Sequence, residues 1–444
     1  MTTSEVPVKA FVAMNPPESG STETSTRVAG SAPSVVPAML LGITAYACAL
    51  DNGFISDDFV MLGRLANWLG DFRTFEFPPE GNRLTLYALL GALRGLFGLS
   101  SAWFYAAAMG IHLLNVWLLS RLLWCLTGRR KFTSLAVMAF AVFQNPQEAV
   151  MWLAGVSDAL AGLFTLLALL AWARERFAWS AVAFGLALAS KESGVAILVL
   201  VPLMDWARVG KLRLRREYLL LLLPAAGFAW LFLATMRQNA YLSEGLVSFG
   251  PAAVLTLLNS AHRLAFPWLY VAFLAALAGT RLRFSREAAL YASWILVTLA
   301  PYSMITYQNH VPSRNQYLAA MGVSALLALL LESLRSARLR AAFAALFVLV
   351  NIGYLWGVKD RQYLRRAAPT SRLLEELRSR PPGELAVSGF PLNPWIAREA
   401  ARHVSGWRPE MIRVGEPCTA GCVRLRWNPD TERYAPDYQS RPGP

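Results

Sequence analysis

Long apolar stretches recur along the chain from about residue 34 to about residue 357, and short polar connections separate them. Many reach about 17 residues or more, the length that an α-helix needs to cross a bilayer core of about 30 Å. A soluble fold has no core large enough to bury so many such stretches. The pattern therefore predicts an all-α polytopic membrane protein with about 11–12 transmembrane helices.

The predicted helices follow these apolar stretches. Two of them, 132–144 and 194–205, are short for the bilayer core, which suggests broken or tilted helices. The stretch 84–98 either crosses the membrane or lies along its surface with Arg94 extended to the interface. The other predicted crossings are 35–54, 101–121, 149–172, 177–190, 217–235, 252–277, 288–305, 317–334 and 340–357.

Composition and charge agree with this class. The 444 residues are 55% hydrophobic and 16% charged, and the net charge is +14. In a soluble protein this charge would suggest that the protein binds nucleic acid. Here Arg and Lys gather in short connections, where they hold the topology and meet anionic lipid headgroups. We therefore expect the lipid bilayer as a partner, and no nucleic acid.

The basic connections also predict an orientation, because positive charges gather in cytoplasmic loops. A cytoplasmic N-terminus and an extracytoplasmic C-terminus follow from their alternation along the chain. The basic connections, which we place in the cytoplasm, are 121–131, 174–176, 208–216, 281–286 and 335–340. The connections then expected to face outward are 51–83, 144–150, the turn at Lys191, 236–250 and 306–316.

Three regions follow from the same reading. Residues 1–33 are polar and rich in Ser, Thr and Pro, which predicts a disordered cytoplasmic tail and no cleavable signal peptide. Residues 34–357 form the membrane domain, whose first outer loop is 51–83. Residues 358–444 predict a small extracytoplasmic α/β domain, which either covers the membrane domain or binds an acceptor. Its predicted strands are 383–391, 411–416 and 422–427, and its predicted helix is 394–404.

The cysteines fit this division. Cys48 and Cys125 lie in or beside apolar helices, where packing is the expected role. Cys418 and Cys422 lie in the C-terminal region, and their spacing lacks the second ligand pair of a zinc site. If this region faces an oxidising compartment, a local disulfide is the expected state.

An acidic pair, Asp57 and Asp58, follows the first apolar stretch and lies in the long outer loop. A connection of this length between two membrane helices is often functional. Carboxylates suit proton abstraction from a hydroxyl group, and they also bind divalent ions such as Mg²⁺ or Mn²⁺. Asp57 and Asp58 are therefore the candidate catalytic residues, and the candidate ligands of such a metal.

Other polar residues gather in the connections predicted to face outward. Lys191 and Arg314 are candidate ligands of a lipid phosphate, since a cation stabilises a departing phosphate. Glu148 could instead cap a helix, and Lys191 could simply neutralise Glu192. Asp158 lies in an apolar helix, where a charge is costly without a partner or a cavity. The candidate supporting residues are Glu148, Asp158, Glu192, His310 and Tyr317.

Carboxylates and cations at one membrane face indicate group transfer from a lipid phosphate. Three alternatives stay open. A transporter or flippase of lipid-linked substrates would need charges along a midplane pathway and often two related halves. A polymerase or ligase of surface glycans would use a pyrophosphate-linked donor. A membrane scaffold would not need the acidic pair.

The order of these polar elements resembles the GT-C superfamily of polytopic glycosyltransferases, and most closely its bacterial relatives of the transmembrane and tetratricopeptide-repeat O-mannosyltransferases. The chain also departs from these relatives. Gln144 stands where they usually have a histidine, and Asn82 stands where they often begin Arg-Pro. No 34-residue repeats follow the membrane region. The elements that carry the resemblance are 54–59, 82–85, 95–99 with 111–115, 143–158, 189–192 and 314–318.

The resemblance implies a GT-C-like membrane domain in a bacterial inner (plasma) membrane. It implies an inverting glycosyltransferase that takes a sugar from a polyprenyl-phosphate donor outside the cytoplasm. The family's acidic motif of the first outer loop, catalytic or metal-binding, maps to Asp57 and Asp58. Its Lys-Glu pair maps to Lys191 and Glu192, and its late-loop arginine to Arg314. The acceptor, an envelope lipid, glycan or protein, is not named by the sequence.

Overall fold

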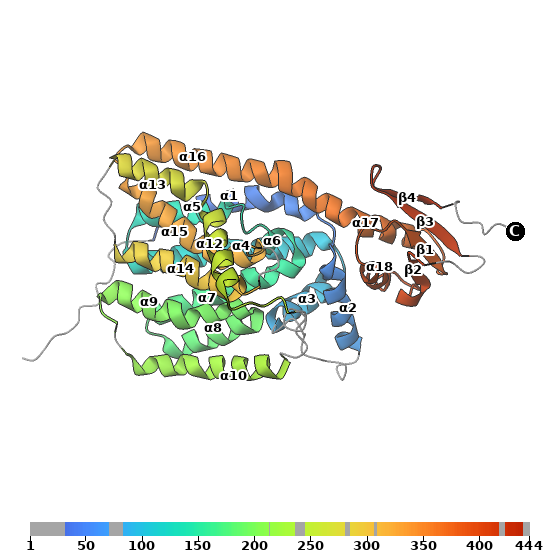
Figure 1. Ribbon diagram of the computed structural model, residues 1–444, viewed down its shortest axis with the longest axis horizontal. Coiled ribbons are helices and arrows are strands. Elements are labelled where there is room, and N and C mark those ends of the chain that lie inside the picture. The colour runs from blue at the N-terminus through green and yellow to red at the C-terminus, as the bar shows by residue number, and fades with distance from the viewer. Residues whose placement is uncertain are drawn as a thin grey trace, which may run out of the picture. The chain divides into compact units, whose positions relative to one another are not determined.

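The computed structural model describes residues 32–70, 83–212, 214–235, 245–279, 285–305, 309–416 and 422–437. Helices form one bundle through most of this range, and a small four-stranded sheet follows it near the C-terminus (Figure 1). The predicted fold class is confirmed. The tail predicted at residues 1–33 lies almost wholly outside the described residues.

The apolar stretches form the helices of the bundle. Five described helices are long and apolar enough to cross a membrane, or six if the bent pair α12 and α13 is one span. Shorter apolar helices, including α1, α3 and α8, pack in the same bundle. The predicted number of crossings therefore stays a prediction. The helices are α1 (Val36–Tyr46), α2 (Asp57–Gly70), α3 (Leu84–Phe97), α4 (Ser101–Thr127), α5 (Arg130–Val142), α6 (Glu148–Met151), α7 (Val156–Ala173), α8 (Phe177–Ser190), α9 (Ile197–Val209), α10 (Leu219–Thr235), α12 (Pro251–Ala265), α13 (Trp268–Gly279), α14 (Arg286–Ser303), α15 (Tyr317–Ser333), α16 (Ala337–Tyr354) and α17 (Asp360–Arg378).

Helices α7 and α15 form the centre of the bundle, whereas α10 is almost wholly exposed on its surface. The close approach of α7 and α15 depends on a small residue, as is common between membrane helices. A Cβ atom at Gly162 would lie only 2.9 Å from the ring of Tyr317. Helix α10 is apolar on every face, which suits contact with lipid tails.

Three predicted helices differ in the structure. The crossing predicted at 149–172 is interrupted by a short 3₁₀ segment η3 (Leu153–Gly155) between α6 and α7. A Cβ at Gly155 would lie 2.1 Å from the carbonyl oxygen of Glu148, so this tight turn requires glycine. The crossing predicted at 252–277 bends by 68° between α12 and α13, next to Pro267, which has no N–H to donate.

The third difference is that the last crossing does not end at 357. Helix α16 continues through a π-helical segment η8 (Leu355–Lys359) into α17. Tyr363 and Ala367 of α17 are buried in the core of the bundle, while Leu373 and Leu377 are buried in the core of the C-terminal domain. The boundary predicted at 358 therefore lies within continuous helix, and α17 joins the two cores.

The C-terminal domain has the α/β character predicted for it. The sheet order is β2-β1-β3-β4, with β1 parallel to β2 and β3, and β4 antiparallel to β3. Strand β4 was not predicted. Cys422 is disulfide-bonded, whereas Cys418 lies outside the described residues. The elements are β1 (Leu385–Ser388), α18 (Pro394–Ala401), β2 (Ile412–Val414), β3 (Val423–Asn428) and β4 (Arg433–Pro436).

Helix α18 packs against α2, the amphipathic helix that begins with the acidic pair. A Cβ atom at Gly63 of α2 would lie 2.3 Å from Glu399 Oε2, so glycine permits this approach. Arg402 donates a hydrogen bond to Asn67 Oδ1 at 3.2 Å, and the rings of Phe59 and His403 lie 6.3 Å apart. The C-terminal domain therefore supports the helix on which Asp57 stands.

Candidate functional site

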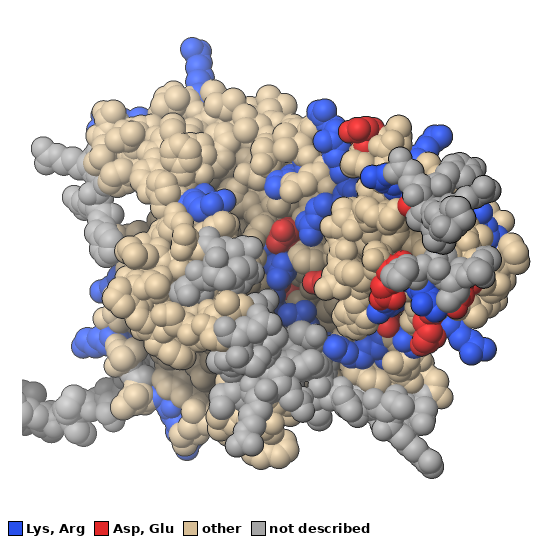
Figure 2. Space-filling view, turned by 45° about the vertical axis from the view of Figure 1, so that its right-hand side comes forward, with Lys and Arg blue, Asp and Glu red and all other residues tan. Residues whose placement is uncertain are grey.

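A polar cavity of about 670 Å³ opens at the end of the bundle where α2 begins. Acidic and basic side chains come together in a hollow near the centre of the space-filling view (Figure 2). Segments far apart in the sequence form its walls. The residues that line it are Asp57, Gln144, Asn145, Gln147, Glu148, Trp152, Arg263, Phe266, His310, Pro312, Ser313, Arg314, Gln316, Tyr354, Lys359 and Arg366.

The two acidic residues occupy different environments. Asp57 is exposed and lines the cavity, whereas Asp58 is fully buried. Asp58 Oδ2 accepts a hydrogen bond from the Ile55 N–H at 2.8 Å, and Oδ1 accepts one from the Ala154 N–H at 3.0 Å. Successive side chains on a helix point about 100° apart, and here Asp57 faces the cavity while Asp58 faces the protein interior. Of the acidic pair, Asp57 is therefore the carboxylate that can be reached from the cavity.

The segment that leads to Asp57 is held by side chains of the bundle. The Tyr105 hydroxyl donates to the Gly53 carbonyl oxygen at 3.0 Å, and the Trp152 indole N–H donates to the Ile55 carbonyl oxygen at 3.4 Å. Asp58 adds the two bonds above and joins this segment to η3. Asp58 thus fixes the position of its neighbour, which gives it a structural role in this arrangement.

The geometry does not fit a metal ion shared by Asp57 and Asp58. Both oxygens of Asp58 already accept backbone N–H groups, and the side chain has no exposed surface. Among the described residues, no group of three or more His, Cys, Asp and Glu side chains could hold a metal ion.

Stability should depend on pH through Asp58. Burial raises the pKa of its carboxyl to about 8, more than the two N–H donors lower it. The folded protein then binds one proton more than the unfolded chain between about pH 4 and pH 8. This contribution to the free energy of unfolding is complete below about pH 4 and is lost as the pH rises through about 8.

Asp58→Asn removes this titration and leaves an amide facing a backbone N–H. The melting temperature of the wild type minus that of Asp58→Asn, measured in neutral detergent, should fall between pH 5 and pH 8. Asp51→Asn, a change of an exposed carboxylate in the segment before α2, serves as the control and should show no such trend. A difference that stays constant or grows with pH would show that Asp58 is ionised throughout.

Arg314 lies on the cavity wall in the short 3₁₀ segment η7 (Arg314–Gln316). Its backbone N–H donates to Glu148 Oε2 at 3.2 Å, and its Nη1 lies 3.7 Å from the same oxygen. Its guanidinium lies 4.8 Å from the centre of the Trp152 ring. Glu148 and Trp152 therefore orient Arg314, as expected where a planar cation must present donors in a fixed direction.

Three further cations of the cavity were missed from sequence: Arg263, Lys359 and Arg366. Arg366 lies over the Trp152 ring at 5.0 Å, so it shares this indole with Arg314. Lys359 and Arg366 follow the last apolar stretch on the side predicted to face outward. Basic residues there run against the positive-inside trend, and this signal could have identified them.

Lys191 and Asp158 do not line the cavity. They form an ion pair with each other, and their side chains are only 2% and 3% exposed. Lys191 Nζ also donates to Asn315 Oδ1 at 2.7 Å, next to Arg314 in the chain. This buried cluster joins α7, the end of α8 and η7. The arrangement favours a positioning role for Lys191 rather than contact with a phosphate.

Of the other predicted residues, one lines the cavity and two do not. His310 lines the cavity with Asp57, Glu148 and Arg314. Tyr317 is buried, where its hydroxyl accepts from the Asn115 amide at 3.0 Å and lies 2.8 Å from His112 Nδ1. Glu192 is partly exposed in a 3₁₀ segment η4 (Glu192–Ala196) beside Lys191, and it does not line the cavity.

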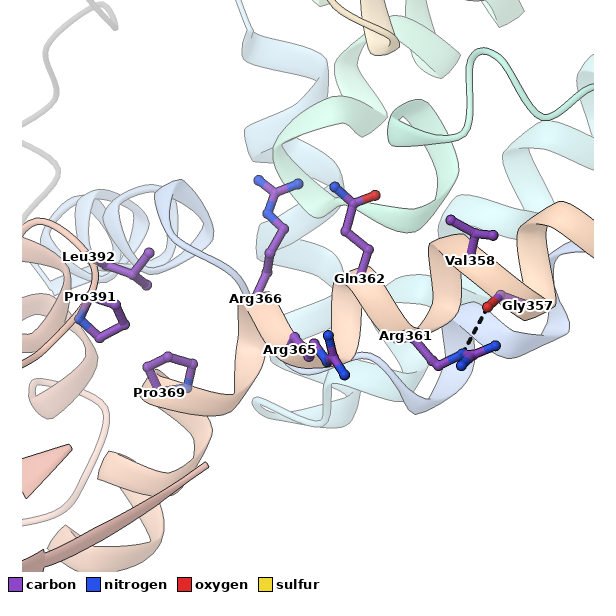
Figure 3. A pocket seen from close by; sticks show the side chains of 9 residues that line it. All are labelled: Gly357, Val358, Arg361, Gln362, Arg365, Arg366, Pro369, Pro391 and Leu392. Carbon is purple, nitrogen blue, oxygen red and sulfur yellow. Dashed lines mark hydrogen bonds between the residues drawn. The ribbon is translucent and has the colours of Figure 1, made fainter. Parts of the chain in front are cut away.

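A second pocket, of about 650 Å³, adjoins this cavity through Arg366. It lies between α17 and residues Pro391 and Leu392 of the C-terminal domain. Arg366 and Gln362 extend from α17 in one direction, and Arg361 and Arg365 extend in another (Figure 3). Positively charged side chains therefore continue from the polar cavity along α17.

The fold defines a class: a polytopic α-helical membrane protein with a small C-terminal α/β domain. No family model and no curated protein matches the chain. Among solved structures, the chain is similar to ArnT from Cupriavidus metallidurans bound to undecaprenyl phosphate. The TM-score is 0.53 at 14% identity, over 89% of this chain and 93% of that one. The apo state of ArnT gives a TM-score of 0.50 at 14% identity with the same coverage.

Proposed function

We propose that this protein is an inverting membrane glycosyltransferase. It moves a sugar from a polyprenyl-phosphate donor to an envelope lipid, glycan or protein acceptor on the outer face of the membrane. One observation carries the proposal: Asp57 lies in a polar cavity with the four cations Arg263, Arg314, Lys359 and Arg366. Transfer from a lipid phosphate requires a base, such as a carboxylate, and positively charged groups that stabilise the departing phosphate.

In the proposed step, Asp57 accepts the proton of the acceptor hydroxyl. The hydroxyl oxygen attacks the anomeric carbon as the bond from this carbon to the phosphate oxygen breaks. The polyprenyl phosphate leaves with the bonding electrons, and the configuration at the anomeric carbon is inverted. Arg314 and Arg366 stabilise the charge that develops on the phosphate, since both are already oriented by Trp152.

The proposed orientation rests on the loops. The basic connections alternate with connections that carry the cavity residues, which supports a cavity outside the cytoplasm. The disulfide-bonded Cys422 supports an extracytoplasmic C-terminal domain, because disulfides persist in oxidising compartments. The similarity of the fold to ArnT bound to undecaprenyl phosphate supports a polyprenyl-phosphate donor.

Binding of undecaprenyl phosphate tests the donor site. Arg314→Gln and Arg366→Gln should each weaken its binding about tenfold or more, because each removes a charged hydrogen-bond donor to the phosphate. Binding of undecaprenol, which lacks the phosphate, should not change. Both lipids can be titrated into the purified protein in neutral detergent and the bound lipid counted by native mass spectrometry.

Arg372→Gln is the matched control, because Arg372 is an exposed arginine of α17 that pairs with Glu375 outside the cavity. It should bind undecaprenyl phosphate like the wild type. If Arg314→Gln and Arg366→Gln also bind it like the wild type, the cavity is not a lipid-phosphate site. The proposed polyprenyl-phosphate donor would then be wrong.

A further inference from the structure

A third pocket, of about 540 Å³, lies between the N-terminal ends of α5 and α16 and the segment that precedes α1. Helix α1 packs against both α5 and α16, so three helices of the bundle meet around it. Its size is within the range of small-molecule sites. The residues that line it are Pro33, Ser34, Arg130, Lys131, Ser134, Leu135, Ala337, Arg340, Ala341 and Ala344.

The pocket is positively charged. Arg130, Lys131 and Arg340 line it together, and among the described residues no acidic side chain lines it. Within the described part of the chain, none of the three forms an ion pair. Their neighbour Arg129 differs, because Glu287 and Glu332 both pair with it. The charge in the pocket is therefore available to a ligand.

The backbone adds to this charge. Arg130 is the first residue of α5 and Ala337 the first of α16, so two helix N-termini meet at the pocket. Each helix N-terminus carries a partial positive charge, which favours an anion, although the Leu339 N–H of α16 already donates to Ser336 Oγ at 3.2 Å. Arg340 is held in place, because its Nη1 donates to the carbonyl oxygen of Leu334 at 2.9 Å.

The walls below the cations are apolar. Leu135, Ala341 and Ala344 line the pocket, and α1 and α16 carry exposed apolar side chains such as Leu40 and Leu346. A ligand that fits this place has an anionic head and apolar tails. A free anion would use only the cations and would leave the apolar surface unused.

We propose that this pocket, formed by α5, α16 and the segment that precedes α1, binds the phosphodiester headgroup of an anionic phospholipid. The acyl chains lie along the exposed apolar sides of α1 and α16, and the phosphate contacts Arg130, Lys131 and Arg340. The site is separate from the reaction cavity and shares no lining residue with it. It does not depend on the proposed glycosyltransfer.

The test is lipid binding by the purified full chain in neutral detergent, counted by native mass spectrometry. The probes are phosphatidylglycerol, phosphatidylcholine and inorganic phosphate. The wild type should bind phosphatidylglycerol about tenfold or more tightly than phosphatidylcholine. Since each cation near an anionic headgroup contributes roughly fivefold, a triple variant with Arg130→Ala, Lys131→Ala and Arg340→Ala should lose on the order of 10²-fold in affinity for phosphatidylglycerol.

The matched control has Lys211→Ala, Arg335→Ala and Arg338→Ala. It removes the same charges from exposed side chains that do not line the pocket, and it should bind like the wild type. Ala341→Trp keeps every charge and fills the pocket, so it should weaken phosphatidylglycerol binding as well. Arg314→Gln, in the reaction cavity, should leave this binding unchanged.

Three results would overturn the proposal. The first is a triple variant that still prefers phosphatidylglycerol as the wild type does. The second is an equal loss in the control, which would assign the preference to surface charge alone. The third is inorganic phosphate binding as tightly as the phospholipid, which would make this a free-anion site. If the triple variant does not fold, Arg130→Gln and Lys131→Gln replace it, and each should lose a few-fold in affinity.

Discussion

Asp57→Asn is expected to lower sugar transfer by on the order of 10²-fold or more, with little change in the binding of undecaprenyl phosphate. Asparagine has nearly the shape of aspartate but cannot accept the proton of the acceptor hydroxyl. Among the described residues, Asp57 lines the cavity and forms no ion pair, whereas Glu148 Oε2 lies 3.7 Å from Arg314 Nη1. The measurement is mass spectrometry of envelope glycans in cells that lack the gene and carry each variant.

The control for this prediction is Asp51→Asn, which changes an exposed carboxylate six residues earlier that does not line the cavity. It should restore the glycans to wild-type levels. Glu148→Gln should also reduce transfer, but through weaker binding of undecaprenyl phosphate, because Glu148 orients Arg314. If Asp57→Asn restores the glycans as fully as Asp51→Asn does, Asp57 is not the base.

The second large effect is expected from Lys191→Met. It leaves the buried carboxylate of Asp158 without its partner and removes the donor to Asn315 Oδ1. Breaking a buried ion pair on one side typically costs about 3–5 kcal/mol, because an uncompensated charge remains. The free energy of unfolding in neutral detergent should fall by about this amount. Lys191→Met combined with Asp158→Leu should recover much of the loss, since no buried charge is left.

A surface ion pair gives the comparison. Arg372→Met removes one partner of the exposed pair with Glu375, and such pairs are worth about 1 kcal/mol or less. If Lys191→Met is no more destabilising than Arg372→Met but abolishes the binding of undecaprenyl phosphate, the positioning role is wrong. Lys191 would then be a phosphate ligand, as the sequence predicts.

The contrast between Asp57 and Asp58 shows where sequence reasoning stopped. Both residues follow the first apolar stretch, and both have the chemistry of a base. Which one faces the cavity depends on the direction of α2 and on the N–H groups of Ile55 and Ala154. Ala154 is almost one hundred residues further along the chain, and no local pattern reports that contact.

Lys191 shows the same limit of sequence reasoning for the partners of a charged residue. Its position between two apolar stretches made it a candidate phosphate ligand in the sequence. Its pairing with Asp158 and Asn315 depends on how α7, α8 and η7 pack together. Arg366 differs in the opposite sense. The sequence places it in the C-terminal soluble region, whereas α17 brings it over Trp152 in the cavity.

The sequence by itself determined the membrane class, the helical bundle, the α/β character of the C-terminal domain and the region of the acidic motif. Each of these depends on local properties: the length of apolar stretches, the alternation of basic loops and the order of short motifs. Only the tertiary structure decided which carboxylate faces the cavity, which lysine is buried, and which cations join Asp57. These depend on contacts between residues far apart in the chain, whose partners are fixed by packing and by the need to satisfy every buried polar group.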